Sequence, residues 1–355
     1  MSVSSLKAGQ LVEVRSKEEI LATLDSNGCL DGLPFMPEMF KYCGQRLPVY
    51  KRAHKTCDTV FPIRARKMTS AVHLETRCDG SAHGGCQAAC LLFWKEAWLK
   101  PLASDSLEPG ASLSEQHSAS GRQRKGGCTE NDVRNAARVE DNEKGEPTYV
   151  CQATRLPYAT GDLNWWEIHQ YFEDYRSGNV GISRILCGLI YKTCFHLSHT
   201  RGTGRLTRWL WNHLPALWRG TPWPFRKGLI PRDQRTPSQD LNLQAGELVR
   251  IKPYEEILRT LNSKNLNRGM YFDKEMVPYC DGEYRVLKRV NKIINEQTGK
   301  MQEMKTPCII LDKVVCQSRY SECRLFCPRS IYSYWREIWL ERVNESTNGV
   351  GQQAS

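Results

Sequence analysis

The strongest constraint on the fold of this chain is an internal repeat. Residues 6–52 align with residues 243–289 without a gap, at a constant offset of 237, and 21 of the 47 pairs are identical. Each copy is followed at a distance by a similar tryptophan-rich segment, at 94–99 and at 335–340. Because similarity at a fixed offset indicates repeated structure, we expect two homologous modules, at 1–100 and 237–345.

The first part of each module reads as a strand followed by a short helix. Residues 11–14 and 248–251 are mainly apolar and follow a glycine. Ser16 and Glu19 have the spacing of a capping box, and Pro253 suits the start of the second helix. Further strands are expected at 47–51 and 284–288. The predicted fold class is α+β, with two small β-rich modules for which we expect an SH3-like barrel.

Two further predictions concern the aromatic residues of the first module. The segment around Phe35 and Met39 is expected to be irregular and half-buried. Trp94 and Trp98 are four residues apart, a spacing that predicts a closing amphipathic helix with both rings in the core.

The modules are separated by two regions of different composition. Residues 101–147 are rich in Ser, Gly, Glu, Asn and Arg, which predicts a disordered, flexible linker with Cys128 exposed in it. Residues 148–236 predict a helical region, with helices starting near Asn164 and at about 180–197 and 206–218. We expect the basic, tryptophan-rich stretch 201–226 to cap the two modules as a packed helical layer, although it also suits an anionic membrane surface. Residues 346–355 are expected to form a disordered tail.

Composition bears on the compartment and on the partners. The chain starts without a secretory pattern and has no apolar run of bilayer length, so we expect a cytoplasmic protein without a transmembrane segment. Its 15 cysteines then indicate metal ligation rather than disulfides. The net charge of +11 makes nucleic acid an alternative partner. Nucleic acid is not the favoured partner, because the positive charge is local: eight of the basic residues fall within 201–235, so the charge of the whole chain is weak evidence. A protein or small-molecule partner stays open.

The densest group of candidate ligands lies in residues 78–90. Three cysteines, one histidine and three glycines occur in these thirteen residues. Thiolates and imidazole bind zinc and iron–sulfur clusters, and the glycines allow the loop to fold the side chains together. The predicted ligand sets are Cys78, His83, Cys86 and Cys90 in the first copy, and Cys308, Cys316, Cys323 and Cys327 in the second. Alternates are His73, Cys43 and Cys280.

Two resemblances add to this interpretation. Cys78, Asp79, Gly80 and Ser81, followed by His83, resemble the signature of CDGSH-type iron–sulfur domains, in which three cysteines and one histidine hold a [2Fe–2S] cluster. This chain differs in having Ala82 before the histidine and in lacking an upstream Cys-x-Cys pair. Residues 78–99 and 324–340 also resemble segments of uncharacterised bacterial Cys/His-rich proteins associated with biosynthetic gene clusters.

The predicted function is a metal-binding accessory or structural protein whose two Cys/His modules hold zinc or an iron–sulfur cluster, with a biosynthetic pathway as the setting that the second resemblance implies. One alternative is a metal-dependent or iron–sulfur enzyme or electron-transfer protein of secondary metabolism. The other is a nucleic-acid-binding protein. The sequence has no Walker A loop, dinucleotide fingerprint, serine elbow or zincin helix, so no enzyme class is predicted.

Overall fold

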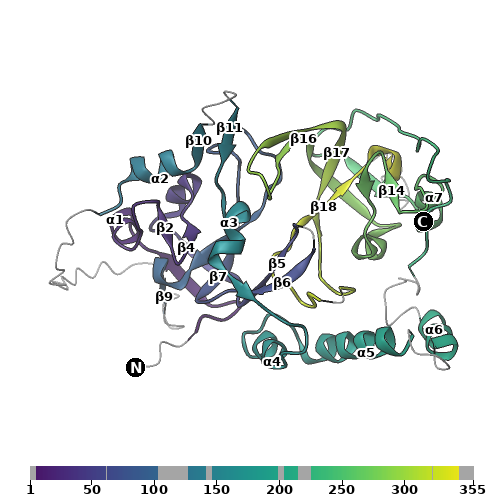
Figure 1. Cartoon of the computed structure of the whole chain (residues 1–355), viewed down its shortest axis with the longest axis horizontal. Coiled ribbons are helices and arrows are strands. Elements are labelled where there is room, and N and C mark those ends of the chain that lie inside the picture. The colour runs from purple at the N-terminus through teal and green to yellow at the C-terminus, as the bar shows by residue number, and fades with distance from the viewer. Residues whose placement is uncertain are drawn as a thin grey trace, which may run out of the picture. The chain divides into compact units, whose positions relative to one another are not determined.

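The computed structural model of the chain describes residues 5–60, 62–102, 127–140, 146–198, 204–214, 225–321 and 323–343. Its contacts divide the chain into two compact units. Unit 1 comprises residues 1–181, 294–302 and 327–329, and unit 2 comprises residues 182–293, 303–326 and 330–355. Both units contain helices and strands (Figure 1), which confirms the α+β class.

The helical middle region is shared between the two units. Helices α3 (Gln152–Ala159) and α4 (His169–Arg176) belong to unit 1. Helices α5 (Ile182–Ser198) and α6 (Gly204–His213) belong to unit 2.

Unit 1 is built on a five-stranded antiparallel sheet with the order β8-β7-β4-β1-β9. Its strands are β1 (Leu11–Val14), β4 (Arg46–Arg52), β7 (Ala71–Arg77), β8 (Leu91–Lys95) and β9 (Leu99–Pro101). A smaller sheet has the order β12-β6-β5, formed by β5 (Lys55–Asp58), β6 (Arg64–Lys67) and β12 (Gly161–Asp162). Helix α3 packs against the hairpin of β2 (Cys29–Leu30) and β3 (Leu33–Pro34).

Unit 2 carries a five-stranded sheet with the matching order β18-β17-β16-β13-β19. Its strands are β13 (Leu248–Ile251), β16 (Glu283–Ile294), β17 (Met301–Val315), β18 (Tyr332–Trp335) and β19 (Leu340–Arg342). The far end of the β16–β17 hairpin, residues 294–302, belongs to unit 1. The pairing of Leu248 with Arg285 in β13–β16 corresponds, at the offset of 237, to the pairing of Leu11 with Pro48 in β1–β4. Unit 2 also contains α7 (Tyr254–Leu258) and the hairpin of β14 (Leu266–Asn267) and β15 (Met270–Tyr271).

The first helix begins as the sequence predicts. Helix α1 (Lys17–Leu21) has a capping box, in which Ser16 Oγ accepts from the Glu19 amide at 3.2 Å and the Glu19 carboxylate accepts from the Ser16 amide at 3.0 Å. These two bonds satisfy backbone donors that a helix start leaves without partners.

Equivalent aromatic clusters fill the two cores. The rings of Phe35 and Trp98 meet edge to face with centroids 5.1 Å apart, and those of Phe272 and Trp339 do so at 5.3 Å. The indole N–H of Trp98 donates to Thr23 Oγ1 at 3.0 Å. The equivalent bond, from Trp339 to Thr260, measures 2.8 Å. Both cores therefore bury a large apolar ring and satisfy its one polar atom.

The expected closing helix is wrong, although both tryptophans are buried as predicted. Trp94 lies on strand β8, and Trp98 ends the single 3-10 turn η2 (Glu96–Trp98) before β9. Strand β8 pairs with β7 and is buried along its whole length, so a strand followed by a turn brings both rings inward. The segment around Phe35 and Met39 is also not half-buried. Both side chains are in the core, next to or within the 3-10 helix η1 (Pro37–Tyr42).

Part of the predicted linker is folded. Residues 103–126 and 141–145 lie outside the described residues. Helix α2 (Glu130–Ala136) and strand β10 (Arg138–Glu140) follow, and β10 pairs with β11 (Pro147–Tyr149). Cys128 is only 7% exposed, not solvent-exposed as expected, because it and Val133 join the core of unit 1.

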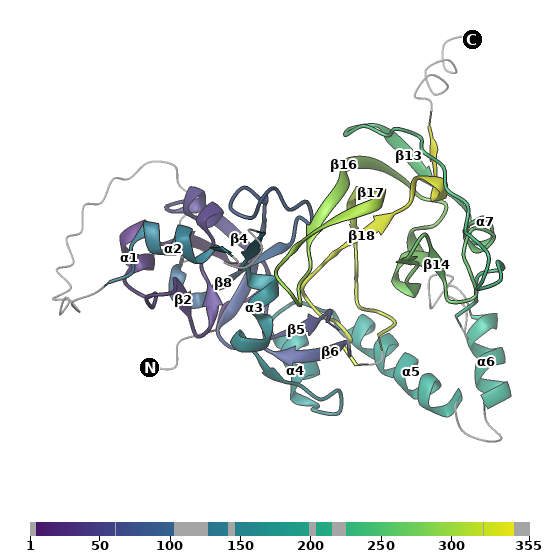
Figure 2. The same ribbon diagram turned by 45° about the horizontal axis from the view of Figure 1, so that its top comes forward.

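Helices α5 and α6 form a hairpin in unit 2 (Figure 2). They meet through Tyr191 and Trp211, whose ring centroids are 5.3 Å apart. In the described part of the stretch 201–226, Trp211 of α6 is buried, whereas Leu206, Trp209 and Leu210 are exposed, so the packed layer stays a prediction. Of the stretch 201–226, which also suits an anionic membrane surface, residues 201–203 and 215–224 lie outside the described residues. Among the helices that the structure describes, none has both the length and the apolar character needed to cross a membrane.

The indole–threonine bonds predict equal effects of one substitution in the two units. Thr23→Val and Thr260→Val each leave a buried indole N–H without an acceptor, which costs about 1–3 kcal/mol. We expect each variant to lower the urea midpoint of its own unit, followed by tryptophan fluorescence. Thr193→Val, at an exposed position of α5, is the control. Midpoints unchanged in both core variants would show that these bonds do not hold the tryptophans.

Candidate metal centre

The segment 78–90 is the connection between β7 and β8. Its base is closed by a hydrogen bond from the Cys78 amide to the Cys90 carbonyl at 2.9 Å, and its tip by one from the Gly85 amide to the Gly80 carbonyl at 2.9 Å. Asp79 accepts from the Ser81 amide at 2.9 Å and from the Ser81 hydroxyl at 2.6 Å. These hydrogen bonds fold the loop back on itself, so that a side chain at its tip can reach the residues at the base of the loop.

Asp79 also anchors the loop to η1 through Lys41, at 2.7 Å. Partial burial raises the pKa of Asp79, but the hydrogen bonds from Lys41 and Ser81 outweigh it and hold the pKa at about 2. Asp79 is therefore a charged structural residue of the loop at neutral pH.

Gly80 is required by the path of this loop. Its φ is +78°, in the left-handed region, and a Cβ placed on it would lie 2.1 Å from the Cys86 carbonyl oxygen. Gly44 has a similar φ of +75° but no atom within 4 Å of such a Cβ. Gly80 is thus constrained by close backbone approach as well as by its dihedral angle.

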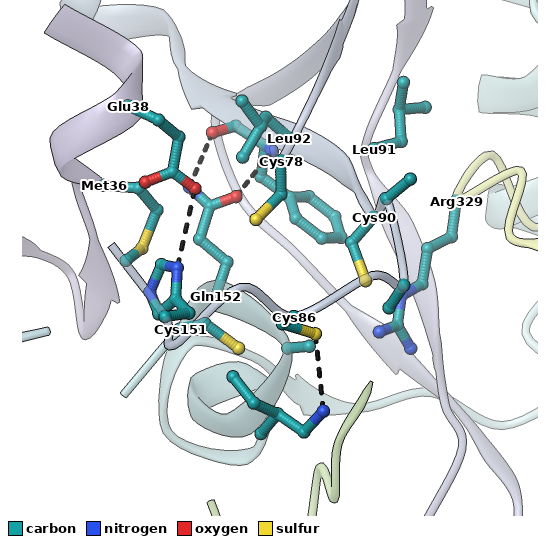
Figure 3. Close-up of a pocket in the computed structure, with 16 residues that line it drawn as sticks. Met36, Glu38, Cys78, Cys86, Cys90, Leu91, Leu92, Cys151, Gln152 and Arg329 are labelled. Atoms are coloured by element: carbon teal, nitrogen blue, oxygen red, sulfur yellow. Dashed lines mark hydrogen bonds and ion pairs between the residues drawn. The ribbon is translucent and has the colours of Figure 1, made fainter. Parts of the chain in front are cut away.

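The loop and η1 bring three potential ligands together. Glu38 comes from η1, Cys78 follows the end of β7, and His83 lies at the tip of the loop. One ligand atom from each lies within 4.8 Å of the others, and His83 Nδ1 is 3.7 Å from Glu38 Oε1. Figure 3 shows the side chains of Glu38 and Cys78 among the residues that line one pocket. The group supplies one nitrogen, one oxygen and one sulfur donor.

The orientation of His83 leaves a lone pair directed at this group. Its Nε2 lies 3.2 Å from the Val150 carbonyl oxygen. A carbonyl can only accept, so Nε2 carries a proton, and in the neutral form of the imidazole Nδ1 then has the lone pair. Metal-binding histidines are commonly fixed in this way by a carbonyl on their other nitrogen.

Within the described residues, a positive charge lies beside Glu38 only when the His83 imidazole, 3.7 Å away, is protonated. Glu38 is 5% exposed, and neither of its carboxylate oxygens has a hydrogen-bond partner in the described part of the chain. Burial, and after it the negative charge of Glu38, raises the pKa of the Cys78 thiol far above its usual range. Burying an unpaired carboxylate costs several kcal/mol unless a cation or a proton accompanies it. A bound cation would satisfy Glu38, Cys78 and His83 together.

Two of the predicted ligands line the same pocket but lie outside this group. The cavity, of about 40 Å³, is also lined by Cys86, Cys90 and Cys151. Cys86 Sγ accepts from the Ile294 amide at 3.3 Å. Burial raises the pKa of Cys90 to about 12, so its thiol is protonated at neutral pH. Of the first predicted set, the structure therefore brings together Cys78 and His83.

The second predicted set is dispersed. Cys327 belongs to unit 1, whereas Cys308, Cys316 and Cys323 belong to unit 2. Cys308 Sγ lies 3.3 Å from Met304 Sδ, and Cys316 Sγ lies 3.6 Å from Ser318 Oγ. Across the residues that the structure describes, the only group of three candidate ligands is Glu38, Cys78 and His83.

The alternates also lie outside this group. Cys43 and Cys280 follow the equivalent 3-10 helices η1 and η4 (Lys274–Tyr279) and pack against the cores of their own units. His73 is fully buried in β7, with Nδ1 2.9 Å from the Leu92 carbonyl oxygen. Burial lowers its pKa to about 3, so it is a neutral core residue.

Glu38 was missed by the sequence analysis, although the repeat contained a signal for it. Its equivalent at the offset of 237 is Glu275, so both copies place a glutamate inside the 3-10 helix, and both are buried. A buried carboxylate at the same place twice is unusual. In unit 2, Glu275 accepts from the Tyr320 amide at 2.6 Å, and burial raises its pKa to about 7.

Comparison with protein-family models and with curated proteins gives no match for this chain. Its function is therefore inferred from the residues of the site alone.

The geometry of Gly80 predicts a steric effect that Gly44 does not share. Both Gly80→Ala and Gly44→Ala place a side chain at positive φ, which costs about 1–2 kcal/mol. Only Gly80→Ala also drives a Cβ into the Cys86 carbonyl. We expect its denaturation midpoint to fall clearly below that of Gly44→Ala. Equal midpoints would show that the loop has room to shift.

The raised pKa of Glu275 predicts a pH dependence of unit 2. Its folded-state pKa of about 7 exceeds the ordinary 4.5, so its contribution to stability is present below pH 4.5 and is lost as the pH rises through 7. The loss amounts to at most about 3 kcal/mol. Glu275→Gln cannot titrate, so it should lose less stability than the wild type between pH 5 and pH 8, measured by urea midpoints. Glu283→Gln, at an exposed position, is the control, and parallel pH profiles would contradict the assignment.

Proposed function

We propose that this is a metal-binding protein that holds one divalent ion, with zinc as the best fit, between Glu38, Cys78 and His83. The observation that carries the proposal is the buried Glu38 carboxylate, which has no hydrogen-bond partner among the described residues and faces an imidazole lone pair and a thiol. Zinc accepts oxygen, nitrogen and sulfur donors in one site. Its charge would also favour the thiolate form of Cys78.

One donor spacing suits a single ion, and all three donor atoms lie within 4.8 Å of one another. His83 Nδ1 and Glu38 Oε1 are 3.7 Å apart. Two ligands of a tetrahedral zinc ion are roughly 3.3–3.7 Å apart, given bonds of about 2.0–2.3 Å. An iron–sulfur cluster, the alternative that the sequence suggested, would need four protein ligands, most of them thiolates. It would have to recruit Cys86 and Cys90 in place of Glu38.

The burial of the site favours a structural role over catalysis. Glu38 and His83 are almost completely buried, and the cavity beside them has space for about one water molecule. An ion there would tie η1 to the β7–β8 loop, two segments separated by about forty residues of chain. We therefore propose an accessory or structural metal site that stabilises unit 1, with a water molecule in the cavity as the fourth ligand of the zinc ion.

We further propose that the two units contain copies of one SH3-like module. The matching strand order, the register conserved at the offset of 237 and the paired tryptophan–threonine bonds support this. Only the first copy would hold an ion, because Glu275 is paired with a backbone amide instead.

Metal analysis of substituted proteins tests the ligand set. We expect about one zinc per wild-type chain, a colourless protein, and loss of the metal in Glu38→Gln, Cys78→Ser and His83→Gln. Cys86→Ala and Cys90→Ala should retain it. Glu275→Gln is the matched control, since it makes the same change at the equivalent position of unit 2. Metal content by mass spectrometry is read together with circular dichroism, so that loss of ligation is separated from loss of fold.

Two results would contradict this proposal. Visible absorption that disappears in Cys86→Ala and Cys90→Ala would indicate the iron–sulfur cluster instead. Absence of any transition metal from wild-type protein purified without chelators would remove the metal site altogether.

A further inference from the structure

A second cavity, in unit 2, is lined by polar residues, among which cationic side chains outnumber carboxylates. It measures about 310 Å³, a size that suits a small organic ligand. Its wall contains five basic residues and two carboxylates. The basic residues are Arg235, Arg268, Arg289, Lys305 and Arg336, and the carboxylates are Asp240 and Glu337.

One of the five cations is neutralised within the protein. Arg289 contacts Glu337 at 2.6 Å and Asp240 at 3.1 Å. Unit 1 has the equivalent pair, between Arg52 and Glu96 at 2.8 Å. This ion pair is therefore part of the shared framework, and it uses both of the carboxylates in the cavity wall.

The repeat shows that another ion pair has been replaced by two cations. In unit 1, the buried ammonium group of Lys95 contacts Asp31 at 2.9 Å. The equivalent residues of unit 2 are Arg336 and Arg268, by the alignments of 94–99 with 335–340 and of 6–52 with 243–289. The aspartate that balances the charge in unit 1 thus corresponds to a second positive charge in unit 2.

These two arginines have unused donors. The Nε atoms of Arg268 and Arg336 are buried and have no hydrogen-bond partner in the described ranges. The other contacts of Arg336 are to the carbonyl oxygens of Thr306, Pro307 and Arg268, and those of Arg268 include Ser238 Oγ at 3.2 Å. None of these acceptors carries a negative charge. Burial lowers the pKa of Arg336, and the charge of Arg268 adds to this effect. A bound anion would accept hydrogen bonds from the buried Nε donors and would reduce the repulsion between the two positive charges.

We propose that this cavity binds a phosphate-bearing small molecule, whose phosphate group lies between Arg268 and Arg336. Guanidinium groups bind phosphate oxygens through two parallel N–H donors, which would satisfy the free Nε atoms. Arg235 and Lys305 are exposed residues of the same wall and add positive charge that attracts the ligand. The site is separate from the metal centre, which lies in unit 1.

Calorimetric titration of the full-length protein tests this proposal. The probes are inorganic phosphate, glycerol phosphate and the dicarboxylate succinate, each at matched ionic strength set with sodium chloride. We expect saturable binding of both phosphate compounds, and at least about tenfold weaker binding of them in Arg268→Asp. That variant should stay folded, because it recreates in unit 2 the charge arrangement that Asp31 and Lys95 have in unit 1.

Arg259→Asp is the matched control. It makes the same change of net charge at an exposed residue of unit 2 outside the cavity, and it should bind phosphate as the wild type does. Equal weakening in both variants would indicate only a general charge effect and would overturn the site. Binding of succinate without binding of either phosphate compound would overturn the ligand class. Melting temperatures of all proteins, measured without ligand, exclude unfolding as the cause of lost binding.

Discussion

The buried carboxylate of Glu38 is the strongest electrostatic constraint in the candidate site of unit 1. A carboxylate removed from water requires a cation, a proton or several hydrogen-bond donors. Beside Glu38 the described residues place an imidazole, whose Nδ1 is 3.7 Å from the carboxylate, and a thiol, which is only a weak donor. The tight 78–90 loop, with its positive-φ glycine and its Asp79 anchor, serves to hold those two groups against η1.

The equivalent glutamate of unit 2 meets the same constraint differently. Glu275 accepts a backbone hydrogen bond from Tyr320, and burial raises its pKa to about 7, which favours the protonated form. The aromatic core and strand order change little between the units, whereas the charges around them change sign. Glu13 pairs with Arg46 in unit 1, and Arg250 pairs with Glu283 at the same positions in unit 2. Core packing thus keeps the same strand order and aromatic contacts in both units, whereas the exposed and cavity-lining charged residues differ between them.

The features that were predicted correctly from the sequence depend on residues that are close together in the chain. The capping box of Ser16 and Glu19 and strands β1, β4, β13 and β16 depend on residues a few positions apart, and these predictions are confirmed. The spacing of Trp94 and Trp98 was ambiguous, because a strand followed by a 3-10 turn also buries residues four apart. Glu38 could not be assigned as a ligand, since its partners lie forty or more residues away and only the fold brings them together.

Predicting metal sites from clusters of cysteine and histidine in the sequence overestimates their number, as the buried cysteines of this chain illustrate. A thiol buried without a compensating charge keeps its proton and packs as a small apolar group, as the raised pKa values of Cys90 and Cys308 show. Arg329, which lies near Cys90, has its charge taken up by Glu296 at 2.8 Å, so it does not hold a thiolate there. Cys78 differs because a buried carboxylate and an imidazole lone pair lie beside it. A cation beside Cys78 would neutralise both the Glu38 carboxylate and the Cys78 thiolate. None of the other described cysteines has two further candidate ligands beside it.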